Sequence, residues 1–228
     1  MGDRRVGEET ADVALREGRE FEARKGHLTA SAFGAWLTKN DATSRKARIT
    51  ATAAVLAHAA GFPDPPVFEN ADIKRGIEQE PEALQYFQRM TGLTVDPIGF
   101  AKSKHGLFGC SPDGLILSNA SGVEIKCPRA SKLIQYHQAG DLPPEYKDQV
   151  HGSMAVLGCQ SYHFLAYHRG LPAFHVEVHR DDYTELMLEG LKAFSTYLYE
   201  TSEQMTALAE TQSDLLEWSQ TQMNETAP

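Results

Sequence analysis

The segment GCSPDGLILSNASGVEIKCP, residues 109–128, constrains the fold of this chain most strongly. Two short apolar runs flank a polar stretch, and this pattern predicts a β-hairpin whose turn lies at 119–122. Its strands would span 113–117 and 123–127. A hairpin with this many apolar side chains is expected to be largely buried in the core of the protein.

Three charged residues interrupt the apolar hairpin. Glu124 and Lys126 share one face of their strand because side chains alternate, and Asp113 lies close to Glu124 across the hairpin. Two neighbouring carboxylates repel each other unless a cation lies between them, and buried charges are costly unless they are paired or bind metal. The pattern therefore predicts a divalent metal site, with Asp113, Glu124 and the main-chain carbonyl of Ile125 as ligands. Lys126 would position a water or stabilise charge on a phosphate. The alternative is a solvated face with a surface ion pair.

The remaining sequence predicts helices around a sheet. Helices are expected over 31–37, 45–60, 71–90, 144–157 and, in one or two pieces, 181–218. Strands are expected within 93–101, 106–117, 122–127, 161–168 and 173–179. This order predicts an α/β (α+β mixed) fold with a central mixed sheet flanked by helices. We expect a single domain over 1–228, in which 1–20 are loosely ordered and 181–228 form a C-terminal helical segment.

Composition narrows the class of protein. The net charge of −9 argues against a protein that coats nucleic acid through a basic surface, but not against an enzyme with a basic cleft. We expect no membrane association, because no apolar run is long enough to span a bilayer. The N-terminus lacks the apolar core of a signal peptide. Together with three cysteines at no metal-ligand spacing, this predicts a cytoplasmic protein with reduced thiols.

Two histidines near the end of the predicted sheet raise the question of a zinc site. His175 and His179 are four residues apart, which on a strand corresponds to about 13 Å, too far for one zinc ion. We therefore expect both on the solvent face of their strand.

Four segments resemble one nuclease family, in its order. The hairpin matches the pattern PD-(D/E)-x-K at Pro112, Asp113, Glu124, Ile125 and Lys126. The other matching segments are RKGHLTAS (24–31), RGIEQEPEALQYF (75–87) and YKDQVHGSMAVLG (146–158). Over roughly residues 20–180 the chain thus resembles the phage lambda exonuclease family, the YqaJ-like viral recombinases.

This resemblance implies a specific activity. Such enzymes have a restriction-endonuclease-like core and are Mg²⁺-dependent 5′→3′ exonucleases that digest one strand of linear double-stranded DNA, leaving a 3′ single strand. The resemblance implies two metal ions in each site, with Mn²⁺ able to substitute. It also implies a ring-shaped homotrimer around the DNA, a single-strand annealing protein as partner in homologous recombination, and a phage or prophage origin in a bacterial host.

The matched motifs also imply residue roles. Asp113 and Glu124 would bind metal, and Glu80 would complete the acidic site. Lys126 would serve the attacking water. The residues near the 5′-terminal or scissile phosphate would be Arg24, Ser31, Ser111 and Gln149. The family usually has a second glutamine where His151 stands, so this chain departs from the pattern there. A candidate basic lining of the DNA channel is the cluster Lys39, Arg45, Lys46 and Arg48.

Two other functions are compatible with these residues. A restriction- or repair-type endonuclease on the same core would cut circular DNA, which an exonuclease does not. A non-catalytic module that binds DNA ends is the second alternative. The intact set of Asp113, Glu124 and Lys126 argues against that module.

Overall fold

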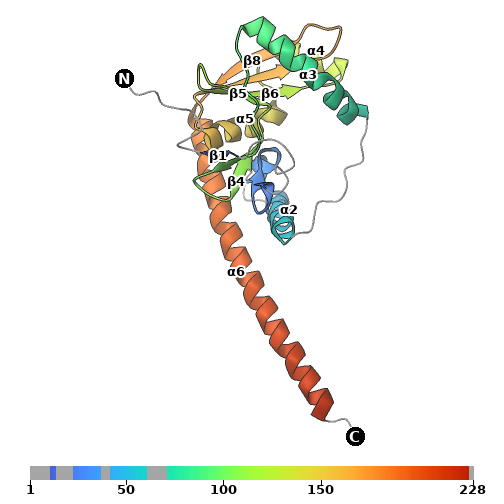
Figure 1. The fold of residues 1–228 in the computed structure, drawn as a ribbon, viewed down its shortest axis with the longest axis vertical. Coiled ribbons are helices and arrows are strands. Elements are labelled where there is room, and N and C mark those ends of the chain that lie inside the picture. The colour runs from blue at the N-terminus through green and yellow to red at the C-terminus, as the bar shows by residue number, and fades with distance from the viewer. Residues whose placement is uncertain (1–10, 14–22, 37–41, 61–70, 226–228) are drawn as a thin grey trace, which may run out of the picture.

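The computed structural model describes residues 11–13, 23–36, 42–60 and 71–225 (Figure 1). Most of the segment 1–20, which the sequence predicts to be loosely ordered, lies outside the described residues, and so does Lys39. Among the described helices, none combines the length and the hydropathy that a membrane crossing requires.

The described elements follow the predicted order in outline. The short strands at Ala11–Val13 and Leu28–Thr29 and the helix at Ala130–Ala139 are additional, and the strand expected within 93–101 begins only at Ala101. The helices are η1 (Ala30–Trp36, a 3₁₀ helix), α2 (Ala42–Ala59), α3 (Ala71–Thr91), α4 (Ala130–Ala139), α5 (Pro144–Leu157) and α6 (Asp182–Glu225). The strands are β1 (Ala11–Val13), β2 (Leu28–Thr29), β3 (Ala101–Ser103), β4 (Phe108–Cys110), β5 (Gly114–Ile116), β6 (Ser121–Lys126), β7 (Ser161–Ala166) and β8 (Phe174–His179).

Two mixed sheets form the centre of the molecule. One sheet has the strand order β5-β6-β7-β8, with β6 parallel to β7 and the other pairs antiparallel. The other has the order β1-β3-β4-β2, with β2 parallel to β4. Helices flank both sheets (Figure 1). The predicted fold class is therefore confirmed, although β4 and β5 belong to different sheets. Pro112 lies between them and has no N–H to continue a ladder.

The predicted hairpin forms, but its turn is displaced. β5 pairs with β6 in the register Gly114↔Val123, and the turn lies at 117–120 instead of the predicted 119–122. Ala120 adopts a φ of 62°, which supplies the turn conformation without a glycine. Gly122 is needed inside the strand, because a Cβ there would lie 2.3 Å from Cε2 of Tyr162.

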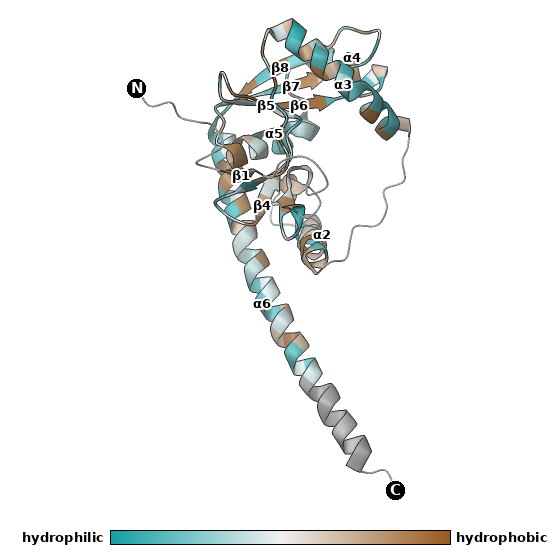
Figure 2. Ribbon diagram, viewed as in Figure 1, coloured by the Kyte–Doolittle hydropathy of each residue, from teal (hydrophilic) through white to brown (hydrophobic). Residues whose placement is uncertain are grey.

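The two faces of the second sheet pack against different helices. On one face, Val123 and Ile125 of β6 form a cluster with Ala83 and Phe87 of α3. On the other face, the larger core includes Phe164 of β7 and apolar residues of α5. Figure 2 shows hydrophobic β6 and β7 between these helices. Ile125 therefore points toward α3, and the neighbouring charged residues of β6 point toward α5.

Two helices differ from the prediction. α4 was not predicted; its N-cap, Arg129, makes no side-chain capping hydrogen bond, and its clearest sequence signal is Gly140 at the C-cap, with φ of 69°. α6 is one continuous helix, 44 residues long. Its first turns bury Met187, Leu191 and Phe194 in the core, and the rest extends away from the sheets (Figure 1).

The predicted solvent position of His175 is wrong. The side chain is half-buried, and its Nε2 lies 3.1 Å from Nδ1 of His163 on β7. The two rings stack with centroids 5.3 Å apart, and Phe87 contacts both. His179 is exposed, as expected. The neighbouring strand thus supplies a partner that the pattern within β8 alone could not reveal.

Candidate active site

The hairpin brings its three charged residues together. Asp113 Oδ2 accepts a hydrogen bond of 2.5 Å from the backbone N–H of Ile125, which fixes the carboxylate against β6. On the opposite face of the strand from the Ile125 side chain, Lys126 Nζ donates to Glu124 Oε1. Glu124 is only 3 % exposed. The alternation expected from the sequence is therefore present, and it places an ion pair inside the protein.

Helix α5 adds a second donor to Glu124. Gln149 Nε2 donates to Glu124 Oε1 over 2.6 Å. One oxygen of the buried carboxylate thus accepts bonds from both Lys126 and Gln149. The ring of Tyr146, three residues before Gln149 on α5, has its centroid 5.5 Å from Lys126 Nζ. Sequence reasoning missed Tyr146, although its helical spacing from Gln149 places both on one face.

The charges in this site are not balanced. Burial and the nearby Glu124 carboxylate raise the pKa of Asp113 to about 7. Burial also raises the pKa of Glu124, although Lys126 opposes this effect. Burial disfavours the charged form of Lys126, but the Glu124 carboxylate outweighs it and the pKa of Lys126 is raised. One buried and one half-buried carboxyl group lie beside a single ammonium, so an additional cation would favour their ionised forms.

The donor set fits a hard divalent cation. Carboxylate oxygens are the preferred protein ligands of Mg²⁺ and Mn²⁺. Among the described residues, no three His, Cys, Asp or Glu side chains converge as a ready ligand cluster. An ion at this position would be held by Asp113 and Glu124, with main-chain and water oxygens completing its coordination. Mg²⁺ in particular retains several waters in protein sites.

Glu80 approaches the site from α3. It is exposed and lines the same open cleft, of about 850 Å³, as Lys126 and Ile125. Its charge contributes to raising the pKa of both Asp113 and Glu124, which places it within electrostatic range of the pair. Glu80, the third predicted acidic residue, therefore faces the site and acts on its two carboxyl groups electrostatically.

The candidate phosphate-binding residues fall into two groups. Arg24 Nη2 donates to Ser111 Oγ over 2.9 Å, and Ser111 lies two residues before Asp113. Ser31 and Gln149 line a second cavity, of about 1020 Å³, between η1, α2 and α5. Each group thus adjoins the hairpin site, one through Ser111 and the other through Gln149.

The basic cluster on α2 is only partly available to line a channel. Arg45 and Lys46 are exposed, and Lys46 lines the cavity beside Ser31 and Gln149. The Arg48 guanidinium instead lies 5.2 Å from the centroid of the Trp36 ring.

His151 lies away from the hairpin carboxylates. It is buried, and its Nδ1 is 2.8 Å from Thr184 Oγ1 of α6.

Comparisons with known proteins show which family and which solved structures the chain resembles. Residues 21–160 match the family model of the YqaJ-like viral recombinase domain. The crystal structure of LHK-Exo in complex with dAMP is similar, with a TM-score of 0.75 and 30 % identity, covering 86 % of this chain and 99 % of that chain. A second structure of this alkaline exonuclease from Laribacter hongkongensis matches with a TM-score of 0.72 and 29 % identity, over the same shares.

A phage-related exonuclease from Haemophilus somnus shares the fold, with a TM-score of 0.57. It is 13 % identical, and the match covers 78 % of this chain and 96 % of that chain. The comparison with curated proteins gives no match.

Proposed function

The chain belongs to the YqaJ-like viral recombinase domain family, and we propose that it is a metal-dependent exonuclease that digests one strand of linear double-stranded DNA from its 5′ end. The observation that carries this proposal is the set of buried Glu124 with half-buried Asp113 and Lys126, in which Gln149 is bonded to Glu124. The similarity to an alkaline exonuclease from Laribacter hongkongensis supports the same activity.

The proposed cofactor is Mg²⁺, with two ions in each site and Mn²⁺ as a substitute. When bound, a divalent ion supplies an activated water and neutralises charge on the scissile phosphate. Asp113 and Glu124 hold the ion through carboxylate oxygens, with the Ile125 carbonyl as a further ligand, and Glu80 faces the same cleft. Gln149 keeps Glu124 in its orientation. Lys126 places its ammonium where it can position the attacking water or a phosphate oxygen.

The DNA end is proposed to bind beside this hairpin. Arg24 offers a planar set of N–H donors that matches two phosphate oxygens, and Ser111 holds the guanidinium next to Asp113. Ser31, at the start of η1, approaches from the side of Gln149. A terminal phosphate held by Arg24 would place the next phosphodiester bond at the carboxylates, which accounts for digestion from the 5′ end.

Digestion of one strand leaves a 3′ single-stranded end. We propose that this product is handed to a single-strand annealing protein for homologous recombination, in the cytoplasm of a bacterial host. We also propose a homotrimeric ring around the duplex. Because the whole chain is acidic, its channel lining would have to concentrate basic residues such as Arg45 and Lys46.

The decisive experiment compares DNA forms and metals. Linear duplex labelled on either end of either strand is incubated with Mg²⁺ or with chelator, beside closed circular duplex. The expected result is Mg²⁺-dependent release of mononucleotides from 5′ ends, an intact complementary strand and uncut circles. Cutting of closed circles would overturn the proposal in favour of an endonuclease. Absence of any cleavage would favour a non-catalytic DNA-end-binding protein.

A further inference from the structure

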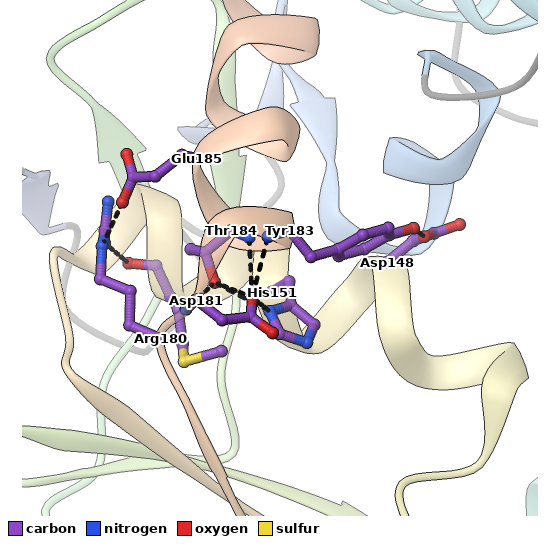
Figure 3. Close-up of polar contacts among 8 residues, drawn as sticks. Asp148, His151, Arg180, Asp181, Tyr183, Thr184 and Glu185 are labelled. Atoms are coloured by element: carbon purple, nitrogen blue, oxygen red, sulfur yellow. Dashed lines mark hydrogen bonds and ion pairs between the residues drawn. The ribbon is translucent and has the colours of Figure 1, made fainter.

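The first turn of α6 contacts α5 at the positions next to Gln149 (Figure 3). Tyr183 Oη donates to Asp148 Oδ1, immediately before Gln149 in the chain. The ring of the same tyrosine has its centroid 3.9 Å from Lys147 Nζ. A single side chain of α6 therefore contacts two consecutive residues of α5 just before the glutamine that bonds to Glu124.

A second contact lies after Gln149. His151 Nδ1 is 2.8 Å from Thr184 Oγ1 and 3.4 Å from Asp181 Oδ1. His151 is 3 % exposed and Thr184 is fully buried. The rings of Tyr183 and His151 also make a T-shaped contact, with centroids 5.1 Å apart. Gln149 is thus bracketed along α5 by contacts to the same turn of α6.

The turn that makes these contacts is itself held in place. Asp181 Oδ1 accepts hydrogen bonds from the backbone N–H groups of Tyr183, at 3.0 Å, and Thr184, at 3.2 Å. An aspartate in this position caps the helix and fixes its first turn. The α6 residues that hold α5 therefore belong to a rigid, capped helix start.

The opposite side of Asp148 is also constrained. A Cβ added at Gly34 of η1 would lie 2.2 Å from Asp148 Oδ2, so the carboxylate lies directly against the backbone of η1. Asp148 is therefore confined between Gly34 on one side and the Tyr183 hydroxyl on the other. Successive residues on a helix differ by about 100° in direction. Fixing Asp148 and His151 consequently fixes the direction in which Gln149 points.

We propose that Tyr183 is a positioning residue of the hairpin site, which acts through Asp148 to hold Gln149 on Glu124. The hydrogen bond from Gln149 occupies Oε1 of Glu124. It therefore also determines where the second oxygen of this carboxylate points. The contact between Tyr183 and Asp148 is present in the metal-free chain and does not depend on the proposed function. Only the consequence for catalysis rests on the proposed function. If the inference is correct, removing the hydroxyl of Tyr183 on α6 should weaken the hydrogen bond between Gln149 and Glu124.

The direct test observes the side-chain amide of Gln149 by NMR in metal-free protein. The signal is assigned by its loss in Gln149→Ala. The test variant is Tyr183→Phe, which keeps the ring on Lys147 and His151 and removes only the donor to Asp148. The matched control is Tyr199→Phe, the same change at an exposed position of α6. Tyr183→Phe should shift the amide signal toward that of an unbonded glutamine and accelerate its proton exchange, whereas Tyr199→Phe should leave it unchanged.

The consequence for metal binding is measured by titration calorimetry with Mn²⁺ in the absence of DNA. Tyr183→Phe should weaken Mn²⁺ binding about fivefold, which is the effect expected when one orienting hydrogen bond is lost. If Tyr183 acts through Gln149, the double variant Tyr183→Phe/Gln149→Ala should bind Mn²⁺ as Gln149→Ala does. With DNA, the same variant should need more Mg²⁺ for half-maximal rate, and saturating Mg²⁺ should restore most of the rate.

The outcomes separate the inference from the proposed function. An unchanged Gln149 amide in Tyr183→Phe overturns the inference, whatever the activity of the wild type. Additive losses in the double variant also overturn it, because Tyr183 would then act independently of Gln149. If the wild type neither binds Mn²⁺ nor cleaves DNA, the proposed function fails, and the amide signal alone decides whether Tyr183 holds Gln149.

Discussion

Arg24 and Ser111 are 87 positions apart in the chain, yet Arg24 Nη2 donates to Ser111 Oγ over 2.9 Å. Ser111 is followed by Pro112 and Asp113, so the bond ties the guanidinium to the start of the hairpin. A guanidinium forms paired, charge-assisted hydrogen bonds with phosphate oxygens. The pair is therefore well placed to receive a terminal phosphate beside the proposed metal site.

Arg24→Ala should lower the initial rate on 5′-phosphorylated duplex about tenfold or more, because charge-assisted bonds of about 1.5–3 kcal/mol are lost. The rate on 5′-hydroxyl duplex should change little, since that end offers no phosphate monoester. Arg24→Lys should recover only part of the rate, because an ammonium cannot form the paired contact. The measurement is the initial rate on both ends for the three proteins. An unchanged preference for the phosphorylated end in Arg24→Ala would remove Arg24 from the phosphate site.

Asp113→Asn should abolish cleavage while stabilising the metal-free protein at alkaline pH. The folded-state pKa of Asp113 is raised from 3.8 to about 7, so the folded chain binds this proton more tightly than the unfolded chain does. Its contribution to stability is therefore lost as pH rises from 3.8 to about 7, and the penalty is constant above that. Asparagine avoids the penalty and keeps an acceptor for the Ile125 N–H.

Thermal unfolding in chelator at pH 5 and pH 8 checks this prediction. The melting temperature of Asp113→Asn should exceed that of the wild type by more at pH 8 than at pH 5, and a gain of 1 kcal/mol corresponds to about 2–4 °C in a chain of this size. Equal differences at both pH values would show that Asp113 is not a strained buried carboxyl. Retained cleavage would show that it is not a metal ligand.

The sequence predicted the hairpin because apolar alternation and a polar turn are local signals. It misplaced the turn because a glycine usually marks one, whereas Gly122 makes room for the Tyr162 ring on the next strand. Glu124 and Lys126 were predicted on one face by the period of a strand. The contacts that complete the site join distant segments, as in the bond from Gln149 to Glu124. From the sequence, only the resemblance to a family identified such distant partners of the hairpin.

Other differences have local physical reasons. α4 begins at Ala130 without a capping side chain, so the usual signal for a helix start is missing. The sequence left open whether 181–218 form one helix or two, although no glycine or proline occurs between Leu191 and Glu225. The pairing of His163 with His175 depends on strand register, which alternation within a single strand does not determine.

Tyr162→Phe should stabilise the protein. Tyr162 is fully buried, and its hydroxyl has no hydrogen-bond partner among the described residues. Removing an unsatisfied buried hydroxyl while keeping the ring on Gly122 should raise the free energy of unfolding by about 1 kcal/mol. Tyr136→Phe is the matched comparison, because its hydroxyl donates to Glu145 over 2.8 Å. That variant should lose stability in the same denaturant titration. A loss of stability in Tyr162→Phe would indicate that the hydroxyl has a partner such as a buried water.

The stacked pair of His163 and His175 should make the fold sensitive to mild acid. Burial lowers the pKa of both imidazoles, while Glu177 opposes this effect for both. His179 lowers the pKa of His163 further, and Phe87 contributes no charge that would stabilise a second imidazolium. A group with a lowered folded-state pKa stabilises the fold above its unfolded pKa of 6.5, and this contribution is lost as pH falls below it.

His175→Gln should therefore flatten the loss of stability between pH 7 and pH 5, by up to about 1.4 kcal/mol per pH unit, the value for one proton. The glutamine can still bond to His163 but cannot become charged. His105→Gln, a change at an exposed histidine whose charge does not act on this pair, should reproduce the wild-type slope. The measurement is the free energy of unfolding by denaturant at several pH values. Identical slopes for the wild type and His175→Gln would locate the acid sensitivity elsewhere, because they would show that His175 binds its proton equally well in the folded and unfolded chains.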